Sequence, residues 1–200
     1  VFAGSIGRPA INPAEIDPVT MPLVPRMMAA LQAGDDESLR VVLSFFEEAG
    51  ISIQGAHQLL PELFPAEGLL TRRAPGDQER RDLERARKVV GLMGPADIGQ
   101  GLVVKSGQVL AVEGAFGTDW MLETLRNRPD EQGGCFYKAP KPDQDRRIDM
   151  PTIGPATIER AAEAKLDGLF VESGGVFVLD VAKCVAVADE AGLFLEVVSV

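Results

Sequence analysis

One charged, proline-rich stretch of this 200-residue chain holds the densest set of side chains that could do chemistry, residues 138–154, KAPKPDQDRRIDMPTIG. Lysine and arginine at close spacing can hold a diphosphate, because arginine forms paired hydrogen bonds to phosphate oxygens and lysine acts as a point charge. Nearby carboxylates can hold Mg²⁺ or orient water, since Mg²⁺ prefers oxygen ligands and keeps water and phosphate in its shell. The cations are Lys138, Lys141, Arg146 and Arg147, and the acids are Asp143, Asp145 and Asp149.

Prolines make this stretch stiffer than an ordinary polar loop. Pro140, Pro142 and Pro151 restrict the backbone, so gathering the charges around a ligand costs less conformational entropy. Composition alone leaves a second interpretation open, in which the stretch is a solvated loop laced with ion pairs. On residue types alone the solvated loop is the favoured interpretation, and the diphosphate site is the alternative.

Two further segments could contribute to such a site. Residues 97–101, DIGQG, lie between an expected helix and an expected strand, and their glycines allow a ligand to approach the backbone closely, although a plain turn is an equal alternative. Gly117-Thr118-Asp119 indicates a helix start with Thr118 or Asp119 as the N-cap. The functional alternative places Asp119 and Glu113 beside a metal ion.

The histidine and cysteine content excludes several kinds of metal site. His57 is the single histidine, so no site with several histidine ligands exists, and a structural role competes with a general acid. Cys135 and Cys184 show no spacing of a zinc site, which predicts free thiols. Asp35 and Asp36 fit a helix cap better than a metal site.

Charge and hydropathy limit the partners. A net charge of −10 and a pI near 4.7 disfavour a nucleic-acid surface and general adhesion to anionic lipid. A hydrophobic content of 46% suffices for a core, whereas no apolar run approaches the roughly 18 residues of a membrane span. The chain shows no secretion leader and starts without Met, so we expect a fragment of a cytoplasmic protein.

The pattern of the whole chain predicts an α+β fold. Residues 1–65 are expected to be mainly helical, with one helix from near Arg26, a second from Asp35 or Asp36 to Gly50, and a short strand at 51–53. Residues 66–78, rich in Pro, Gly and charge, predict a flexible connection. Residues 79–200 predict a mixed, αββα-type domain that contains the 138–154 stretch, with helices expected at 79–93, 118–127, 156–166 and 181–191.

The mixed domain also shows an internal similarity. Residues 101–113, GLVVKSGQVLAVE, can be laid over residues 168–180, GLFVESGGVFVLD, and both contain a Ser-Gly turn of the kind found in tight hairpins. We therefore expect a duplicated helix–hairpin–helix unit, with chance convergence of two short hairpins as the alternative. Paired hairpins would suit a homodimer interface.

Residues 138–154 resemble the signature of LpxI-type UDP-2,3-diacylglucosamine pyrophosphatases. The matching positions are Lys138, Lys141, Pro142, Gln144, Asp145, Arg147, Asp149, Pro151 and Gly154. Other matches keep the order of the family along the whole chain, namely Gly4, Arg8-Pro9, Gly34-Asp35-Asp36, Gly55-Ala56-His57, residues 97–101, Glu113 and Gly117-Thr118-Asp119. In the family, part of a smaller nucleotide-fold-like domain precedes the point where this chain begins.

The resemblance implies an activity and a location. It implies hydrolysis of the pyrophosphate bond of UDP-2,3-diacylglucosamine, giving 2,3-diacylglucosamine 1-phosphate (lipid X) and UMP in lipid A biosynthesis. It also implies a peripheral protein on the cytoplasmic side of the inner membrane. The alternative is a binding module for a UDP-linked lipid that does not cleave it, and a purely structural dimerisation domain is a third reading.

The resemblance also assigns roles to residues. Asp149 is implied as a Mg²⁺ ligand or as the base for the attacking water, and Lys138, Lys141 and Arg147 as the groups that neutralise the diphosphate. Substrate contacts are implied for Gln144, Asp145, Asp97, Gln100, Thr118 and His57, and further Mg²⁺ ligands are Asp119 and Glu113.

One segment departs from the family. Phe116 stands where the family has an acidic residue, and Trp120 follows Asp119. Two aromatic side chains at these positions could cap or close a groove for acyl chains. The departure bears on the acyl-chain preference more than on the type of reaction.

Overall fold

The computed structural model describes residues 1–2, 12–33, 35–130, 132–142 and 144–199. Gly4, Arg8, Pro9, Gly34 and Asp143, which the sequence singled out, lie outside them, as do the side chains of Asp35 and Asp36. The chain divides into two compact units, residues 1–61 with 144–149 and residues 62–143 with 150–200. The domain division that the sequence indicates at residues 65 and 78 stays a prediction.

The first unit is helical. Its longer helices are α1 (Val24–Ala33) and α2 (Asp35–Glu48), and shorter turns are η1 (Pro13–Glu15), η2 (Met21–Leu23) and α3 (Ala56–Leu59). Arg26 of α1 reaches across to Glu48 at 2.8 Å and to Ser44 at 2.9 Å on α2. Gly50 takes a positive φ of 77° two residues after the last residue of α2, which is the geometry that glycine provides at a helix end.

The strand that the sequence predicts at 51–53 is wrong. Residues 51–55 have no regular structure, and Ile51 is exposed. A strand needs a partner for its backbone N–H and C=O groups, and the described residues of the first unit contain no sheet that could supply one. The two isoleucines at 51 and 53 were therefore a misleading signal.

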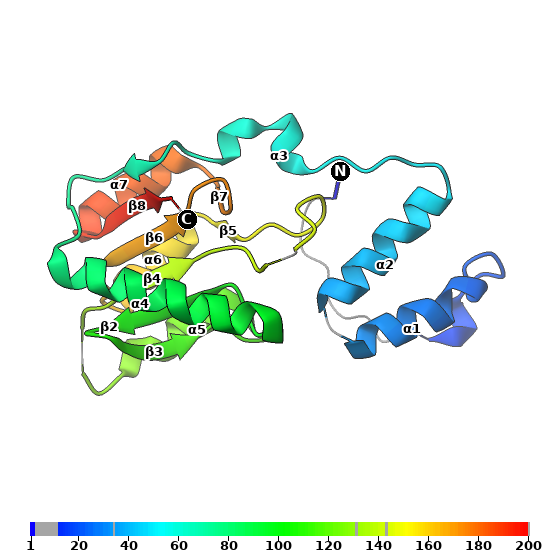
Figure 1. The fold of residues 1–200 in the computed structure, drawn as a ribbon, viewed down its shortest axis with the longest axis horizontal. Helices are drawn as coiled ribbons and strands as arrows, with labels where there is room; N and C mark the ends of the chain where they lie inside the picture. The colour runs from blue at the N-terminus through cyan, green and yellow to red at the C-terminus, as the bar shows by residue number, and fades with distance from the viewer. Residues whose placement is uncertain (3–11, 34, 131, 143, 200) are drawn as a thin grey trace. The chain divides into compact units, whose positions relative to one another are not determined.

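The second unit is built on a six-stranded mixed sheet (Figure 1). Three central strands run parallel, and the strands at both sides of them are antiparallel. The order across the sheet is β1 (Gly68–Leu69), β8 (Phe194–Val198), β6 (Gly168–Glu172), β4 (Cys135–Lys138), β2 (Gly101–Lys105) and β3 (Gln108–Val112). A separate parallel pair joins β5 (Thr152–Ile153) and β7 (Phe177–Val178).

Helices cover both faces of this sheet. The long helix α4 (Asp77–Met93) packs Leu83, Ala86 and Val90 on one face. The other face is covered by α5 (Gly117–Thr124), α6 (Pro155–Glu163) and α7 (Val181–Ala191). Burial on both faces explains why central strands such as β6 are continuous apolar runs. The α+β fold and these four helices are confirmed, and short turns η3 (Pro61–Leu63), η4 (Gly94–Ala96) and η5 (Leu125–Asn127) complete the unit.

The expected duplication is wrong. Residues 101–113 do form an antiparallel hairpin of β2 and β3, but residues 168–180 do not. Strand β6 has parallel neighbours on both sides, β4 and β8, so neither of its hydrogen-bonding edges is open to a returning strand. Strand β7 pairs with β5 instead. Because residues 168–180 form no hairpin, they give no support to a homodimer interface made of paired hairpins.

The stretch 66–78, which the sequence indicates as a connection, is attached to the sheet. Strand β1 pairs antiparallel with β8, and the buried hydroxyl of Thr71 accepts a hydrogen bond from Leu195 N at 2.9 Å. Arg72 pairs with Asp189 at 3.0 Å, and Arg73 pairs with Asp167 at 3.1 Å. These contacts give the stretch defined partners.

A buried carboxylate fixes the β2–β3 turn. Ser106 and Gly107 have φ angles of 49° and 78°, as a tight two-residue hairpin turn requires. Asp82 of α4 accepts hydrogen bonds from both turn amides, at 2.9 Å from Ser106 N and 2.7 Å from Gly107 N. The helix on one face of the sheet thus holds the hairpin at its tip.

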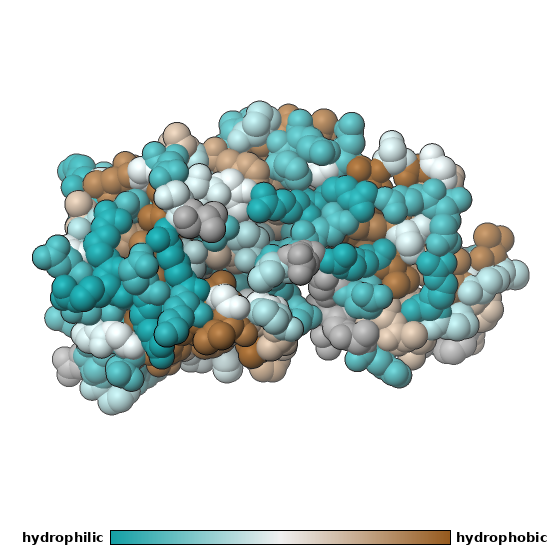
Figure 2. All heavy atoms as spheres, in the orientation of Figure 1, coloured by the Kyte–Doolittle hydropathy of each residue, from teal (hydrophilic) through white to brown (hydrophobic). Residues whose placement is uncertain are grey.

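Two composition-based expectations have structural counterparts. Cys135 and Cys184 are free thiols in the core, as expected. Over the part of the chain that the structure describes, no helix is long and apolar enough to cross a membrane. Figure 2 shows a face that is mostly hydrophilic, with hydrophobic side chains in separate groups.

Candidate functional site

Lys138 is a buried cation at the carboxyl end of β4. Side chains alternate along a strand, so Lys138 lies on the same face as Phe136, toward α5, and is only 3% exposed. Its Nζ donates to Thr118 Oγ1 at 2.6 Å and lies 3.1 Å and 3.4 Å from the two carboxylate oxygens of Glu113. A buried charge requires such partners, and these three side chains form one group.

Glycines let Glu113 come this close. Glu113 follows β3, and its backbone N–H donates to Gly101 O at 2.8 Å. A Cβ at Gly99 would lie 2.0 Å from Glu113 O, and a Cβ at Gly101 would lie 2.8 Å from Glu113 Oε2. The glycines of the 97–101 segment therefore give room to a carboxylate of the chain itself.

The expected N-cap of α5 is wrong. The helix begins at Gly117, its N-cap residue is Phe116, and no side chain caps it. Thr118 instead places its hydroxyl on Lys138 Nζ. Thr118 is thus a partner of the buried lysine, which the cap interpretation did not include.

Lys141 forms a second cation–carboxylate pair in the same unit. Its Nζ donates to Asp97 Oδ1, and Asp97 takes a left-handed φ of 52° directly after η4. The backbone carbonyl of Gln100 accepts from Ala139 N at 3.0 Å. The ring of Pro142 lies against Gly94, where a Cβ would be 2.3 Å from Pro142 Cδ. Residues 97–100 therefore flank the chain between the two lysines.

Asp119 has a different partner from Glu113. It lies in the first turn of α5, is exposed, and faces Arg160 of α6 at 3.5 Å. Both oxygens of Glu113, in contrast, are within reach of Lys138. The two carboxylates that the sequence suggested as joint metal ligands are each engaged by a separate cation.

The other half of the charged stretch belongs to the first unit. Arg147 holds Asp145 through a fork of hydrogen bonds of 2.7–3.2 Å and also donates to Glu47 of α2 at 2.6 Å. The hydrogen bonds from Arg147 lower the pKa of Asp145 below its ordinary value, and the same bonds raise the pKa of Arg147. Glu47 is a site partner that the sequence did not indicate, because it comes from a helix 100 residues earlier.

Asp149 is held by neighbours in the same segment. Gln144 Nε2 donates to Asp149 Oδ2, and the Asp149 N–H donates to Asp145 O at 3.2 Å. His57 lies in α3, and its ring is so close to Gly55 that a Cβ there would be 2.4 Å from Cε1. The same Cβ would be 3.1 Å from Arg146 O, so the 55–57 turn and the 144–149 segment are neighbours.

The structure thus forms two groups from the predicted site residues. One group, in the second unit, contains Lys138, Lys141, Glu113, Thr118, Asp97 and Gln100. The other, in the first unit, contains Gln144, Asp145, Arg147, Asp149 and His57. The chemical roles given to these residues stay predictions.

The donor set suits Mg²⁺ only with help from a ligand. Among the described residues, no three His, Cys, Asp or Glu side chains come together to hold a metal. Mg²⁺ in phosphate-handling sites takes one or two carboxylates and completes its shell with phosphate oxygens and water. Asp149, whose amide partner Gln144 orients it, fits that role.

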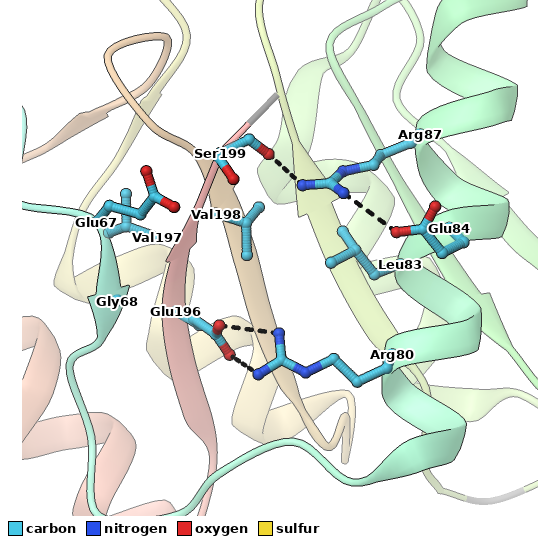
Figure 3. A pocket seen from close by; sticks show the side chains of 10 residues that line it. All are labelled: Glu67, Gly68, Arg80, Leu83, Glu84, Arg87, Glu196, Val197, Val198 and Ser199. Carbon is cyan, nitrogen blue, oxygen red and sulfur yellow. Dashed lines mark hydrogen bonds and ion pairs between the residues drawn. The ribbon is translucent and has the colours of Figure 1, made fainter.

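A cavity of about 300 Å³ in the second unit lies away from these lysines, between α4 and the β1–β8 edge (Figure 3). Arg80 pairs with Glu196 at 2.8 Å and Arg87 with Glu84 at 3.1 Å, so its cations are matched by carboxylates. Its lining residues are Glu67, Gly68, Arg80, Leu83, Glu84, Arg87, Glu196, Val197, Val198 and Ser199. None of them is a residue that the sequence indicated for the site.

Comparisons with known proteins give one family for both parts of the chain. A model of the LpxI N-terminal domain matches residues 1–63, and a model of the LpxI C-terminal domain matches residues 66–196. A UDP-2,3-diacylglucosamine pyrophosphatase LpxI from Caulobacter vibrioides is 41% identical over 201 aligned positions. The alignment covers 97% of this chain and 72% of that protein.

Proposed function

Because this chain belongs to the LpxI family, we propose that it hydrolyses UDP-2,3-diacylglucosamine to 2,3-diacylglucosamine 1-phosphate and UMP in lipid A biosynthesis. It is a hydrolase that acts on a diphosphate bond. The proposal further includes dependence on Mg²⁺ and work at the cytoplasmic surface of the inner membrane, where a substrate with two acyl chains would reside. The buried Lys138 group is the observation that carries it.

Lys138 supports this reaction because its position is fixed before a ligand arrives. The ammonium group is enclosed by Glu113 and Thr118 at the carboxyl end of a central strand, the edge where ligands of such sheets bind. A donor held in place costs no reorganisation when negative charge builds on the diphosphate oxygens. Lys138 would therefore stabilise the transition state more than the ground state.

Lys141 and Arg147 would bind the diphosphate in a more adaptable way. Each is paired with a carboxylate, Lys141 with Asp97 and Arg147 with Asp145. A diphosphate could accept hydrogen bonds from these cations while they keep their carboxylate partners. The ligand-free protein therefore does not have to hold an unpaired positive charge. Cations placed in this way would allow a chain of net charge −10 to bind an anionic ligand.

Asp149 would position the attacking water, or hold Mg²⁺ that in turn polarises the diphosphate. Mg²⁺ held by Asp149 would supply neutralisation of phosphate charge. Water would form a bond to one phosphorus, the bridging P–O bond would break, and the proton of the water would pass to Asp149. Gln144 keeps the Asp149 carboxylate in one orientation.

Release of UMP from the lipid substrate tests the proposal. Asp149→Ala is expected to abolish turnover while circular dichroism and the melting transition stay those of the parent protein. Asp77→Ala, which removes an exposed carboxylate at the start of α4, is the matched control and should keep full activity. Full activity of Asp149→Ala would contradict the assignment of Asp149.

Chelation gives a second test. EDTA is expected to stop UMP release, and added Mg²⁺ to restore it, with Asp149→Asn requiring more Mg²⁺ than the parent protein. Activity that persists in EDTA would contradict the dependence on Mg²⁺, whereas the proposed hydrolysis would stand. Tight binding of substrate with no UMP release under any condition would identify a binding module instead.

A further inference from the structure

Three side chains meet at the carboxyl end of the parallel strands, on the face of the sheet that α4 covers. The hydroxyl of Tyr137, on β4, donates to Glu172 Oε2, at the end of β6, at 3.2 Å. Burial and the charge of Glu172 raise the pKa of Tyr137, whereas Arg87 of α4 acts in the opposite direction, so its guanidinium also lies near this phenol. We call Arg87, Tyr137 and Glu172 the strand-end group.

The strand-end group connects three neighbouring strands. Tyr137 belongs to β4 and Glu172 to β6, and Arg87 donates to the backbone carbonyl of Ser199, directly after β8 (Figure 3). Because β4, β6 and β8 run parallel, their carboxyl ends lie at the same edge of the sheet. One arginine of α4 therefore links the helix to the ends of all three strands.

Tyr137 is the residue before Lys138, and successive side chains of a strand point to opposite faces of the sheet. Tyr137 is 2% exposed on the α4 face, and Lys138 is 3% exposed on the face toward α5. The backbone of both residues is paired in register with β2 on one side and β6 on the other. A displacement of Tyr137 would therefore move the backbone that carries Lys138.

Glu172 also supports the chain between the two lysines, through Gly175. A Cβ at Gly175 would lie 3.0 Å from Glu172 Oε1 and 2.7 Å from Pro140 Cδ, so the carboxylate and the proline ring both pack on this glycine. The Gly175 N–H donates to Glu172 O at 3.1 Å, which closes the loop after β6. Since Pro140 stands between Lys138 and Lys141, the carboxylate of Glu172 steadies the segment on both sides of Lys138.

The strand-end group and the partners of Lys138 lie on different faces of the sheet. Lys138 Nζ contacts Glu113 and Thr118 on the α5 side, whereas the phenol of Tyr137 packs among the residues under α4. The backbone of β4 lies between them. Any influence of the strand-end group on Lys138 therefore passes through the strand.

We propose that the strand-end group positions the Lys138–Lys141 segment for hydrolysis of the diphosphate. Arg87 and Glu172 are then positioning residues, which touch neither substrate nor metal. This inference rests on the proposed function and adds to it the residues that keep a fixed donor in place. Such a donor stabilises developing charge only at the right position, and a misplacement of about 1 Å can cost about 10²-fold in rate. The loss should fall on kcat, because Lys138 acts on charge that builds in the transition state.

Steady-state kinetics of UMP release test the inference. Glu172→Ala should lower kcat about five- to tenfold and keep KM within about twofold of the parent, because the acceptor of the Tyr137 hydroxyl is lost. Glu172→Gln keeps an acceptor oxygen, so its kcat should stay within about twofold of the parent. Tyr137→Phe removes the donor of the same hydrogen bond. It should lose as much as Glu172→Ala, and the double variant should lose no more than either single one.

Glu196→Ala is the matched control. Glu196 lies on β8 on the same face and pairs with Arg80 of α4 at 2.8 Å, outside the strand-end group. Its loss should lower the melting temperature and leave kcat of the folded molecules unchanged, which separates positioning from general stability. Tyr137, the single tyrosine, gives a readout without turnover, since its tyrosinate absorbance should appear at lower pH in Glu172→Ala and not in Glu196→Ala.

Several results would overturn the inference. They are a parental kcat in folded Glu172→Ala, additive losses in the double variant, and an unchanged Tyr137 titration in Glu172→Ala. A rise of KM alone would make Glu172 a substrate contact, and loss of one limb of the pH–rate profile would make it an acid or base, and both contradict positioning. A parent protein that releases no UMP would contradict the proposed function as well, whereas an active parent with unaffected variants would contradict this inference alone.

Discussion

The two halves of the charged stretch hold their cations in opposite ways. Lys138 is an integral part of a central strand, is almost fully buried, and is fixed by Glu113 and Thr118 from two other elements. Arg147 lies on a turn, has a side chain 37% exposed, and is held by Asp145 two residues away and by Glu47. One contiguous signature can therefore supply both a rigid cation and an adaptable one.

The strongest test of this comparison removes the rigid cation. Lys138→Met keeps an unbranched side chain that is one atom shorter, and it should lower kcat/KM for UMP release by about 10²–10³-fold, as loss of one fixed donor does. It also leaves the Glu113 carboxylate buried without its cation, which is strongly destabilising. The double variant Lys138→Met/Glu113→Gln restores neutrality, so it should fold as the parent protein and remain inactive. Activity of the folded double variant within tenfold of the parent would contradict the role of Lys138.

The rigidity of the second unit can be tested away from the lysine. Asp82→Ala removes the carboxylate that accepts from Ser106 and Gly107, so we expect the free energy of unfolding to fall by about 2–3 kcal/mol in urea titrations. The UMP release of the molecules that remain folded should not change. Glu84→Ala, two residues further along α4 and exposed, is the control and should stay within about 0.5 kcal/mol of the parent.

A smaller effect is expected from the adaptable cation. Arg147→Lys keeps the charge but loses the fork that holds Asp145, so kcat/KM should fall about tenfold, less than for Lys138. Arg26→Lys, which affects another arginine pair of the same unit, should leave turnover unchanged. If Arg147→Lys proved as damaging as Lys138→Met, the contrast between the two cations would be wrong.

The smallest effect at neutral pH concerns Tyr137, the residue before Lys138. Burial, and then the charge of Glu172, raise its pKa to about 12. Because the folded state disfavours the phenolate, this contribution to stability is complete below the ordinary pKa near 10 and is lost as the pH rises toward 12. Tyr137 is the single tyrosine, so tyrosinate absorbance follows it directly, and ionisation near pH 10 without unfolding would show that the strand end is open to water.

Local sequence pattern predicted the helices of the second unit well. Helices α4, α6 and α7 have apolar residues at helical spacing and clear start signals, such as Pro155 at the first position of α6. The predicted strand at 51–53 and the predicted hairpin pairing within 168–180 failed for a different reason. Apolar composition indicates that a segment can be a strand, but the partner of a strand depends on which sheet edges the rest of the chain leaves open.

The candidate site also has a part that local sequence indicates and a part that depends on the fold. Spacing and residue type identified the lysines, Arg147 and Asp149, because closely spaced cations and acids with prolines are visible in a single segment. No local signal indicated Glu47, which comes from α2, or that Glu113 and Thr118 enclose Lys138. The contacts of Glu113 and Thr118 with Lys138 arise when β3 returns beside β2 and α5 begins near the end of β4.

The sequence by itself determined the family, the class of reaction and the segment that bears the charges, because these depend on residue types in a fixed order. The fold decided which carboxylate each cation faces, that residues 144–149 join the helical unit, and that Phe116 and Trp120 are exposed and pack on each other. The physical reason is that burial and ion pairing are set by what folds against a residue, and those neighbours are distant in the sequence.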